Sequence, residues 1–189
     1  MRVITFLSLL LAFAMLAAAP DISEARPRHI PTMRHARQQN DAQNTVQKQQ
    51  TADIREVQNS FFSITLPEGW KLEKPVVPAA DRVSAVFMKG DFTRIALNIF
   101  KIPFTKELMA EKTAENMRTR GMEVSQPVEK DGFCVVDISK KGVNGKGWFG
   151  KNGGTGASTV IFAPDLTEAN ELLQCLKTSV PDIVPARVD

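Results

Sequence analysis

Three stretches in the middle of the chain have the apolar pattern of β-strands. They are residues 61–66, 83–88 and 94–102. In the first, Phe62, Ile64 and Leu66 fall on one face of an extended backbone, as in a half-buried strand. The other two are apolar on both faces, which is typical of strands that are covered on both sides. The pattern therefore predicts a sheet with helices, or a helix and long loops, over both of its faces.

Turn signals separate these strands. Residues 89–91, Lys-Gly-Asp, have the composition of a hairpin turn, so the second and third strands are expected to be antiparallel neighbours. Residues 66–69 read Leu-Pro-Glu-Gly, which fits a type I turn with Pro at its second position and Gly at its fourth. Trp70 follows this turn directly, and we expect it to fold back onto the end of the first strand.

One helix is predicted between residues 105 and 120. Thr105 can accept a backbone hydrogen bond at its start, and Gly121 provides a stop, because Gly adopts the left-handed conformation that ends many helices. Small and apolar side chains recur at helical spacing along one side: Ala110, Thr113, Ala114 and Met117.

A second helix is predicted near the C-terminal end. Pro164 and Asp165 open it, and Asp165 and Glu168 have the spacing of a capping box. Pro181 is expected to end it, because proline cannot continue a helix. Its apolar stripe consists of Ala169, Leu172, Leu173 and Leu176.

More strands are expected between and beyond these helices. Residues 122–125 and 133–140 are predicted to form an antiparallel pair, and residues 158–162 a last strand. The order of strands, helix, strands, helix indicates an α+β fold in which a mainly antiparallel β-sheet is flanked by helices.

A glycine-rich stretch precedes the last strand. Seven of the eleven glycines lie in residues 142–156, where residues 145–151 spell G-x-x-x-x-G-K. A phosphate loop would need Ser or Thr in place of Asn152 and a helix after it, so a hairpin that turns at residues 152–154 is favoured. Trp148 and Phe149 lie on its first strand. They are either buried in the sheet or project as contacts to a protein partner.

The start of the chain has the features of a secretory signal. Met1 and Arg2 precede an apolar run that ends at Ala19, and cleavage is expected after Ala19 or, preferably, after Ala25. The run is about 17 residues long, at the lower limit for crossing a bilayer, so an uncleaved N-terminal membrane anchor is the alternative. We therefore expect a periplasmic or secreted protein.

Residues 26–57 are rich in arginine and glutamine and poor in large apolar side chains, which predicts a flexible basic arm. It is either a solvated spacer or a contact to an acidic partner or to anionic lipid headgroups. The arginines that would make such contacts are Arg26, Arg28, Arg34 and Arg37. The folded domain is expected over residues 58–184, with a C-terminal tail at 185–189.

Charge is unevenly distributed along the chain. The formal net charge is +3, but residues 56–189 contain 17 basic and 17 acidic residues. A neutral domain has no field that would attract DNA or RNA, so nucleic acid is not expected as a partner.

Few residues in the domain are typical of catalysis. The two histidines, His29 and His35, both lie in the arm, where they cannot be held in a fixed geometry. No spacing points to lysine- or carboxylate-based chemistry. No cofactor, metal site or catalytic residue is therefore predicted.

The two cysteines, Cys134 and Cys175, lie on a predicted strand and on the last predicted helix. Because exported proteins meet oxidising conditions, a disulfide between them is one interpretation. Two buried thiols that act as small apolar side chains are the other. In both cases the role is structural.

Residues 62–70, Phe-Ser-Ile-Thr-Leu-Pro-Glu-Gly-Trp, resemble the opening of PsbP-like and DcrB-like domains, where an F-S-I-x-x-P-x-G-W strand and turn lead into a sheet. The resemblance covers about residues 58–184. It implies an α/β/α sandwich and a small, mostly non-catalytic accessory protein, and it carries over no catalytic residues. The chain lacks the lipobox cysteine of the lipid-anchored members. A photosynthetic role does not follow from a fold.

Three functions are consistent with these features. The first is an exported accessory or assembly module that binds a protein partner in the cell envelope. The second is a carrier of a small apolar ligand between sheet and helix, in a pocket lined by Met88, Phe100 and Met117. The third is an enzyme that uses carboxylates or lysine. We expect the first.

Overall fold

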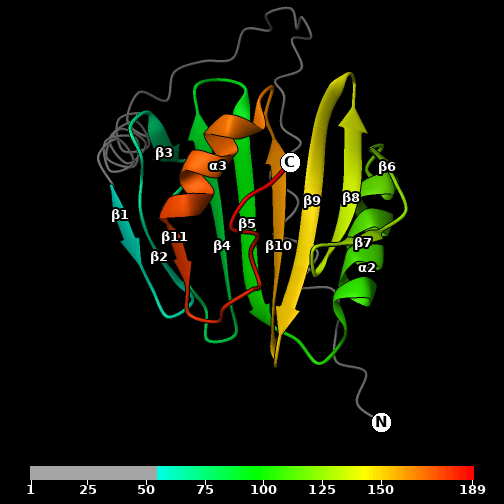
Figure 1. Cartoon of the computed structure of the whole chain (residues 1–189), viewed down its shortest axis with the longest axis horizontal. Coiled ribbons are helices and arrows are strands. Elements are labelled where there is room, and N and C mark those ends of the chain that lie inside the picture. Colours follow the sequence, from blue (N-terminus) through cyan, green and yellow to red (C-terminus); the bar gives the residue numbers. More distant parts are fainter. Residues whose placement is uncertain (1–54) are drawn as a thin grey trace, which may run out of the picture. The chain divides into compact units, whose positions relative to one another are not determined.

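Two long hairpins form the middle of the computed structural model, which describes residues 55–189 (Figure 1). Strands β4 (Arg82–Lys89) and β5 (Thr93–Lys101) pair antiparallel, and Gly90 in their turn has a φ of 59°. Strands β9 (Val143–Asn152) and β10 (Thr155–Phe162) form the second hairpin. Both hairpins are where the sequence predicts them, and β10 pairs antiparallel with β5.

Shorter strands extend this sheet on both sides. The strand order is β3-β4-β5-β10-β9-β8-β6, and β7 also pairs with β8. The added strands are β3 (Trp70–Leu72), β6 (Glu123–Val124), β7 (Val128–Lys130) and β8 (Phe133–Lys140). All pairings in the sheet are antiparallel, so the predicted α+β class with a mainly antiparallel sheet flanked by helices is confirmed.

Helix α2 (Lys106–Thr119) has the predicted ends. The Leu108 amide donates to the Thr105 hydroxyl, and Gly121 just beyond the helix has a φ of 76°. The buried side of α2 consists of Met109, Ala110, Ala114 and Met117. It packs on β8 and β9.

Helix α3 (Leu166–Cys175) begins as predicted, with the Asp165 carboxylate accepting from the Thr167 amide. The predicted end at Pro181 is wrong. The chain leaves the helix at Leu176 and forms strand β11 (Leu176–Thr178), which pairs with β2 (Phe62–Thr65). A third strand, β1 (Glu56–Gln58), completes a separate three-stranded sheet in the order β1-β2-β11. Pairing with a strand more than 110 residues away overrides the helical periodicity of these residues.

The turn before Trp70 also differs from the prediction. The Trp70 amide donates to the Pro67 carbonyl, so the turn spans residues 67–70 and places Gly69 at its third position. Gly69 has a φ of 78°, which a type I turn does not permit there and a type II turn requires. Trp70 itself folds back into the core as expected, with 6% of its surface exposed.

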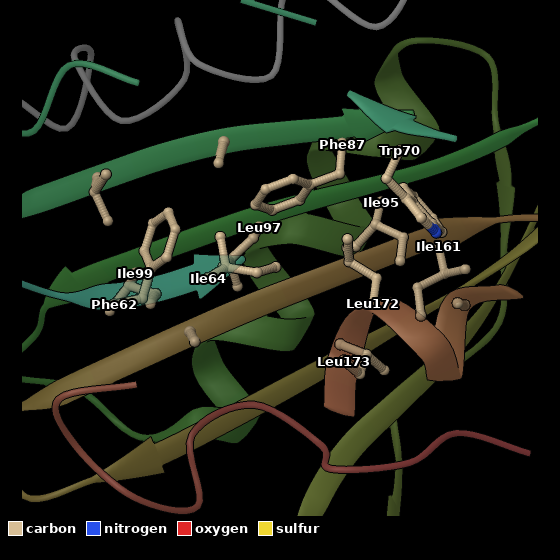
Figure 2. Close-up of a cluster of buried hydrophobic side chains, with 14 of the residues drawn as sticks. Phe62, Ile64, Trp70, Phe87, Ile95, Leu97, Ile99, Ile161, Leu172 and Leu173 are labelled. Atoms are coloured by element: carbon tan, nitrogen blue, oxygen red, sulfur yellow. The ribbon is translucent and has the colours of Figure 1, made fainter. Parts of the chain in front are cut away.

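The main core lies between the large sheet, α3 and the three-stranded sheet. Figure 2 shows Leu172 and Leu173 reaching from α3 toward apolar side chains of the sheet. The rings of Phe62 and Phe87 meet edge to face, with centroids 6.3 Å apart, and so join the two sheets. Alternate residues of β5, namely Ile95, Leu97 and Ile99, point into this core and are almost fully buried.

Residues 179–189 pack on the same side of the sheet. Ile183 and Val188 are 1% and 3% exposed and belong to the core. The Asn170 side chain bonds both main-chain groups of Val188, and Asp189 accepts from Lys130. Residues 185–189, which the sequence leaves as a tail, are therefore part of the packed domain.

A substitution at Gly150 tests whether residues 179–189 pack on β9, because a Cβ at this position would touch the main chain of Ile183. We expect Gly150→Ala to lower the free energy of unfolding by about 1–3 kcal/mol, as overpacking does in a closed site. Gly154→Ala is the matched control, since a Cβ there meets no atom within 4 Å, and it should change stability by less than about 0.5 kcal/mol. Urea denaturation measures both, and equal effects would show that the 179–189 segment does not pack against β9.

Candidate functional site

One half of one sheet face is left open by the helices. Side chains of successive residues alternate between the two faces of a strand, and facing residues of antiparallel neighbours share a face. On β4, the residues Val83, Ala85 and Phe87 are buried toward α3, whereas Ser84 is exposed and Val86 half-buried on the opposite side. Helix α2 covers that opposite side mainly at β6, β8 and β9, at the other end of the sheet (Figure 1).

We call this region the open sheet face. It consists of the exposed and half-buried residues that β3, β4, β5 and β10 place on the α2 side: Lys71, Arg82, Ser84, Val86, Met88, Arg94, Asn98 and Phe162. The two-sided apolar pattern predicts a cover here, and within residues 55–189 neither helix supplies it. Ala96 and Phe100 lie between these residues and are buried, with 8% and 9% of their surfaces exposed. On β10, Ser158 and Val160 of the same face are also buried, so this strand contributes only Phe162.

The registers give the layout of this face. Lys71, Met88, Arg94 and Phe162 face one another across four strands, and two residues further along, Val86 faces Ala96. Ser84 faces Asn98, whose side-chain amide donates to Ser158, and Arg82 faces Phe100 at the far end. Glu73 continues the β3–β4 ladder opposite Val86, because its amide donates to the Val86 carbonyl. The centre is therefore apolar and weakly polar, with one carboxylate beside it and an arginine near each end.

A cleft of about 640 Å³ lies on the opposite face, where α3 does not cover the other half of the sheet. Its floor consists of polar residues of β6, β8 and β9, and its apolar wall is Ile161, Ala163 and Leu166 near the start of α3. The full lining is Glu123, Val124, Ser125, Asp137, Ile138, Ser139, Asn144, Gly145, Lys146, Ile161, Ala163 and Leu166.

Several polar groups of the cleft are used by the fold. The Lys146 ammonium donates to the main-chain oxygen of Asp189 at 2.9 Å. The Ser125 hydroxyl accepts from the Asp137 amide and donates to the Gln126 carbonyl. Glu123 and Asp137 are exposed to water. The cleft is an open groove lined by both polar and apolar residues.

Trp148 and Phe149 are both buried, with 5% and 0% of their surfaces exposed. The interpretation that they project to a partner is therefore wrong. Their strand is central in the sheet, between β8 and β10, so each ring packs into one of the two layers. Trp148 belongs to the core on the α3 side, and Phe149 points to the α2 side.

The structure also contradicts a disulfide between Cys134 and Cys175, because both thiols are free. Cys134 lies under α2, where its Sγ is 3.8 Å from Glu107 Oε1, whereas Cys175 packs against the core on the α3 side. The sheet lies between them, and a disulfide needs Cα atoms about 4.4–6.8 Å apart.

The surroundings of Cys134 keep its thiol protonated. Burial raises the pKa of Cys134, and the nearby Glu107 carboxylate raises it further. The pKa of Glu107 is itself lowered, mainly by its own backbone N–H at the start of α2 and then by Thr105. Cys134 is therefore a structural residue and not a nucleophile.

The apolar pocket expected at Met88, Phe100 and Met117 is not formed by these residues. Met117 is 1% exposed beneath α2, whereas Met88 and Phe100 belong to the sheet region that α2 does not cover. None of the three lines the cleft. The space under α2 is filled by its own buried side chains, Met109, Ala110, Ala114 and Met117.

Other sequence predictions lie outside the described residues. These are the secretory signal, the basic arm up to residue 54 with Arg26, Arg28, Arg34 and Arg37, and the two histidines. The predicted end of the arm at residue 57 is wrong, because Glu56 and Val57 pair with β2 as part of β1. Within residues 55–189, no helix is long and apolar enough to cross a membrane, and no group of three His, Cys, Asp or Glu residues is placed to hold a metal ion.

Lys71, Arg82 and Arg94 were not identified from the sequence as site residues. They are ordinary surface cations until the strand register places them on one face. The available signal was weak: Arg82 and Arg94 each stand at or next to the start of a strongly apolar strand.

No protein-family model matches the chain, and no curated protein matches it. Among solved structures, the chain is similar to a cyanobacterial PsbP (CyanoP) from Synechocystis, with 11% sequence identity and a TM-score of 0.41. The match covers 67% of this chain and 95% of that chain. It is also similar to a crystal structure from Bacteroides thetaiotaomicron, with 14% identity and a TM-score of 0.37, covering 64% of this chain and 46% of that chain. The chain thus spans less than half of the second structure.

Thiol chemistry tests directly whether Cys134 and Cys175 are unpaired and lie in different surroundings. We expect oxidised native protein to keep both thiols, so that denaturation releases two reactive groups and the intact mass shows no loss of two hydrogens. In native protein at about pH 8, Cys175 should react with a thiol reagent faster than Cys134, because burial keeps Cys134 neutral.

The variants Cys134→Ala and Cys175→Ala each keep one thiol, so they show which cysteine gives which reaction rate. A chain that loses both thiols on oxidation, or in which Cys134 reacts first, would contradict this arrangement.

Proposed function

We propose that this protein is a non-catalytic, exported accessory or assembly module that binds a protein partner in the cell envelope. The observation that carries the proposal is the open sheet face, a surface over strands β3, β4 and β5 that reaches β10 at Phe162. Its strands are held from behind by the main core, so the surface is rigid before a partner arrives. A rigid surface loses little conformational entropy on binding.

The composition of this face fits a protein contact. It combines half-buried apolar side chains, Val86, Met88 and Phe162, with arginines at its margins. Interfaces have apolar centres and polar rims, and methionine, phenylalanine and arginine are enriched in them. The export component of the proposal rests on the signal-like apolar run at residues 3–19.

The packing of the domain gives less support to a carrier of a small apolar ligand. Such a ligand needs an enclosed apolar space. The cleft is open to solvent and not enclosed, and the layers beneath α2 and α3 are filled with side chains.

To test which uncovered region binds the partner, the same change, Ser to Trp, is made in each of them. Ser84→Trp places an indole on the open sheet face, and Ser139→Trp places one in the cleft. With the mature chain as bait in an envelope extract, we expect Ser84→Trp to weaken capture of the partner about tenfold, or about 1.4 kcal/mol. Ser139→Trp should leave capture unchanged.

Thermal unfolding of both variants controls for folding. Loss of the partner only with Ser139→Trp would move recognition to the cleft, and a bait that enriches no partner would contradict the assembly function.

A further inference from the structure

We infer that the open sheet face binds an acidic polypeptide segment whose apolar side chains lie between carboxylates. This inference rests on the proposed function and specifies the chemistry of the partner. The open sheet face is positively charged. The side chains on this face include three cations, Lys71, Arg82 and Arg94, against one anion, Glu73, which stands just beyond β3.

The acidic residues near these strands stand outside them. Glu73 lies just beyond β3 and faces Val86, so it is the one carboxylate on this face. Asp81 precedes β4, and Asp91 is in the hairpin turn. Residues 56–189 as a whole contain equal numbers of basic and acidic residues. The positive charge of this face is therefore a local property, and its complement is a negatively charged surface.

The two arginines are available for a partner. The ion pairs of the described residues involve Lys89, Lys106, Lys112 and Lys130, and neither Arg82 nor Arg94 takes part in them. Both are half-buried, which limits the number of conformations that binding must freeze. A guanidinium group can hold a carboxylate through two parallel hydrogen bonds, which gives direction as well as charge.

The register sets the spacing that a partner must match. Arg82 faces Phe100, which is six residues along β5 from Arg94. At about 3.4 Å per residue, the two arginines are about 20 Å apart along the strands. Between them lie Val86, Ala96 and Ser84. A matching segment therefore has carboxylates about 20 Å apart and small apolar side chains between them.

Charge also excludes two other occupants. A second copy docked face to face would bring the two sets of cations together, which is unfavourable. Residues 26–40 of this chain contain four arginines and no acidic residue, so they share the sign of the face. A membrane is disfavoured because the large apolar side chains that protrude most, such as Val77 and Phe92, stand in a loop and at a hairpin tip instead of on this face.

A defined peptide tests the inference. The probe is a short synthetic peptide with a Leu-Val-Leu centre and Glu-Glu pairs whose carboxylates are about 20 Å apart when extended. It is titrated into the full mature chain, and backbone amide shifts are followed by NMR. We expect shifts confined to β3, β4 and β5, and binding that is lost near 1 M salt, where charges are screened beyond about 3 Å.

Two double variants distinguish a specific effect of the two arginines from an effect of the protein's overall charge. Arg82→Gln with Arg94→Gln should weaken binding at least about tenfold, because it removes two charge-assisted contacts. Lys177→Gln with Arg187→Gln removes the same charge from exposed residues that do not belong to this face, and should change affinity less than about twofold. The same peptide with Gln in place of Glu should not bind.

Three results would overturn the inference: no binding of the Glu peptide, shifts that map to the cleft, or binding only to vesicles of anionic lipid. If Ser84→Trp abolishes partner capture but the Glu peptide does not bind, the acidic chemistry is wrong and the assembly function stands. If capture also fails, both are wrong.

Discussion

The covering of the large sheet is the constraint on which the rest of the structure depends. A sheet seven strands across is about 30 Å wide, whereas a helix is about 10 Å in diameter. One helix therefore covers two or three strands, and this domain has two helices for two faces. Helix α3, with the three-stranded sheet and residues 179–189, covers one face over β3, β4, β5 and β10. Helix α2 covers the other face over β8 and β9. The diagonal arrangement leaves one uncovered region on each face: the open sheet face and the cleft.

The local elements of this fold could largely be predicted from the sequence, because their signals are local. Gly90 and Gly153 mark the two hairpins, Thr105 and Gly121 mark the ends of α2, and Asp165 marks the start of α3. The predictions are wrong where contacts with a segment distant in the sequence determine the local structure. Leu176 has helical periodicity with the α3 stripe, yet it pairs with Ile64 in a strand. Val188 has no periodic pattern around it, yet Asn170 and the core hold it.

The candidate site was harder to predict than the fold for the same reason. An apolar strand pattern states that both faces can be buried, but not which face receives a helix. Cys134 and Cys175 both belong to apolar stripes, and only the tertiary structure shows that the sheet separates them. Trp148 and Phe149 are adjacent in sequence and therefore point to opposite layers, which leaves neither ring free for a partner. Arg82 and Arg94 become candidate binding residues only because the strand register places them on one face with Val86 and Met88.

The central claim is that β4 has one buried side and one free side, and the most direct test is the accessibility of two neighbouring residues. Ser84 is exposed and Ala85 is 4% exposed. In a mature chain with Cys134→Ala and Cys175→Ala, the measurement is the rate at which a soluble thiol reagent labels the Ser84→Cys and Ala85→Cys variants. This account predicts that Ser84→Cys is labelled at nearly the rate of an unfolded peptide, and Ala85→Cys only after unfolding. Slow labelling of both variants would show that this face is covered, and would contradict the account.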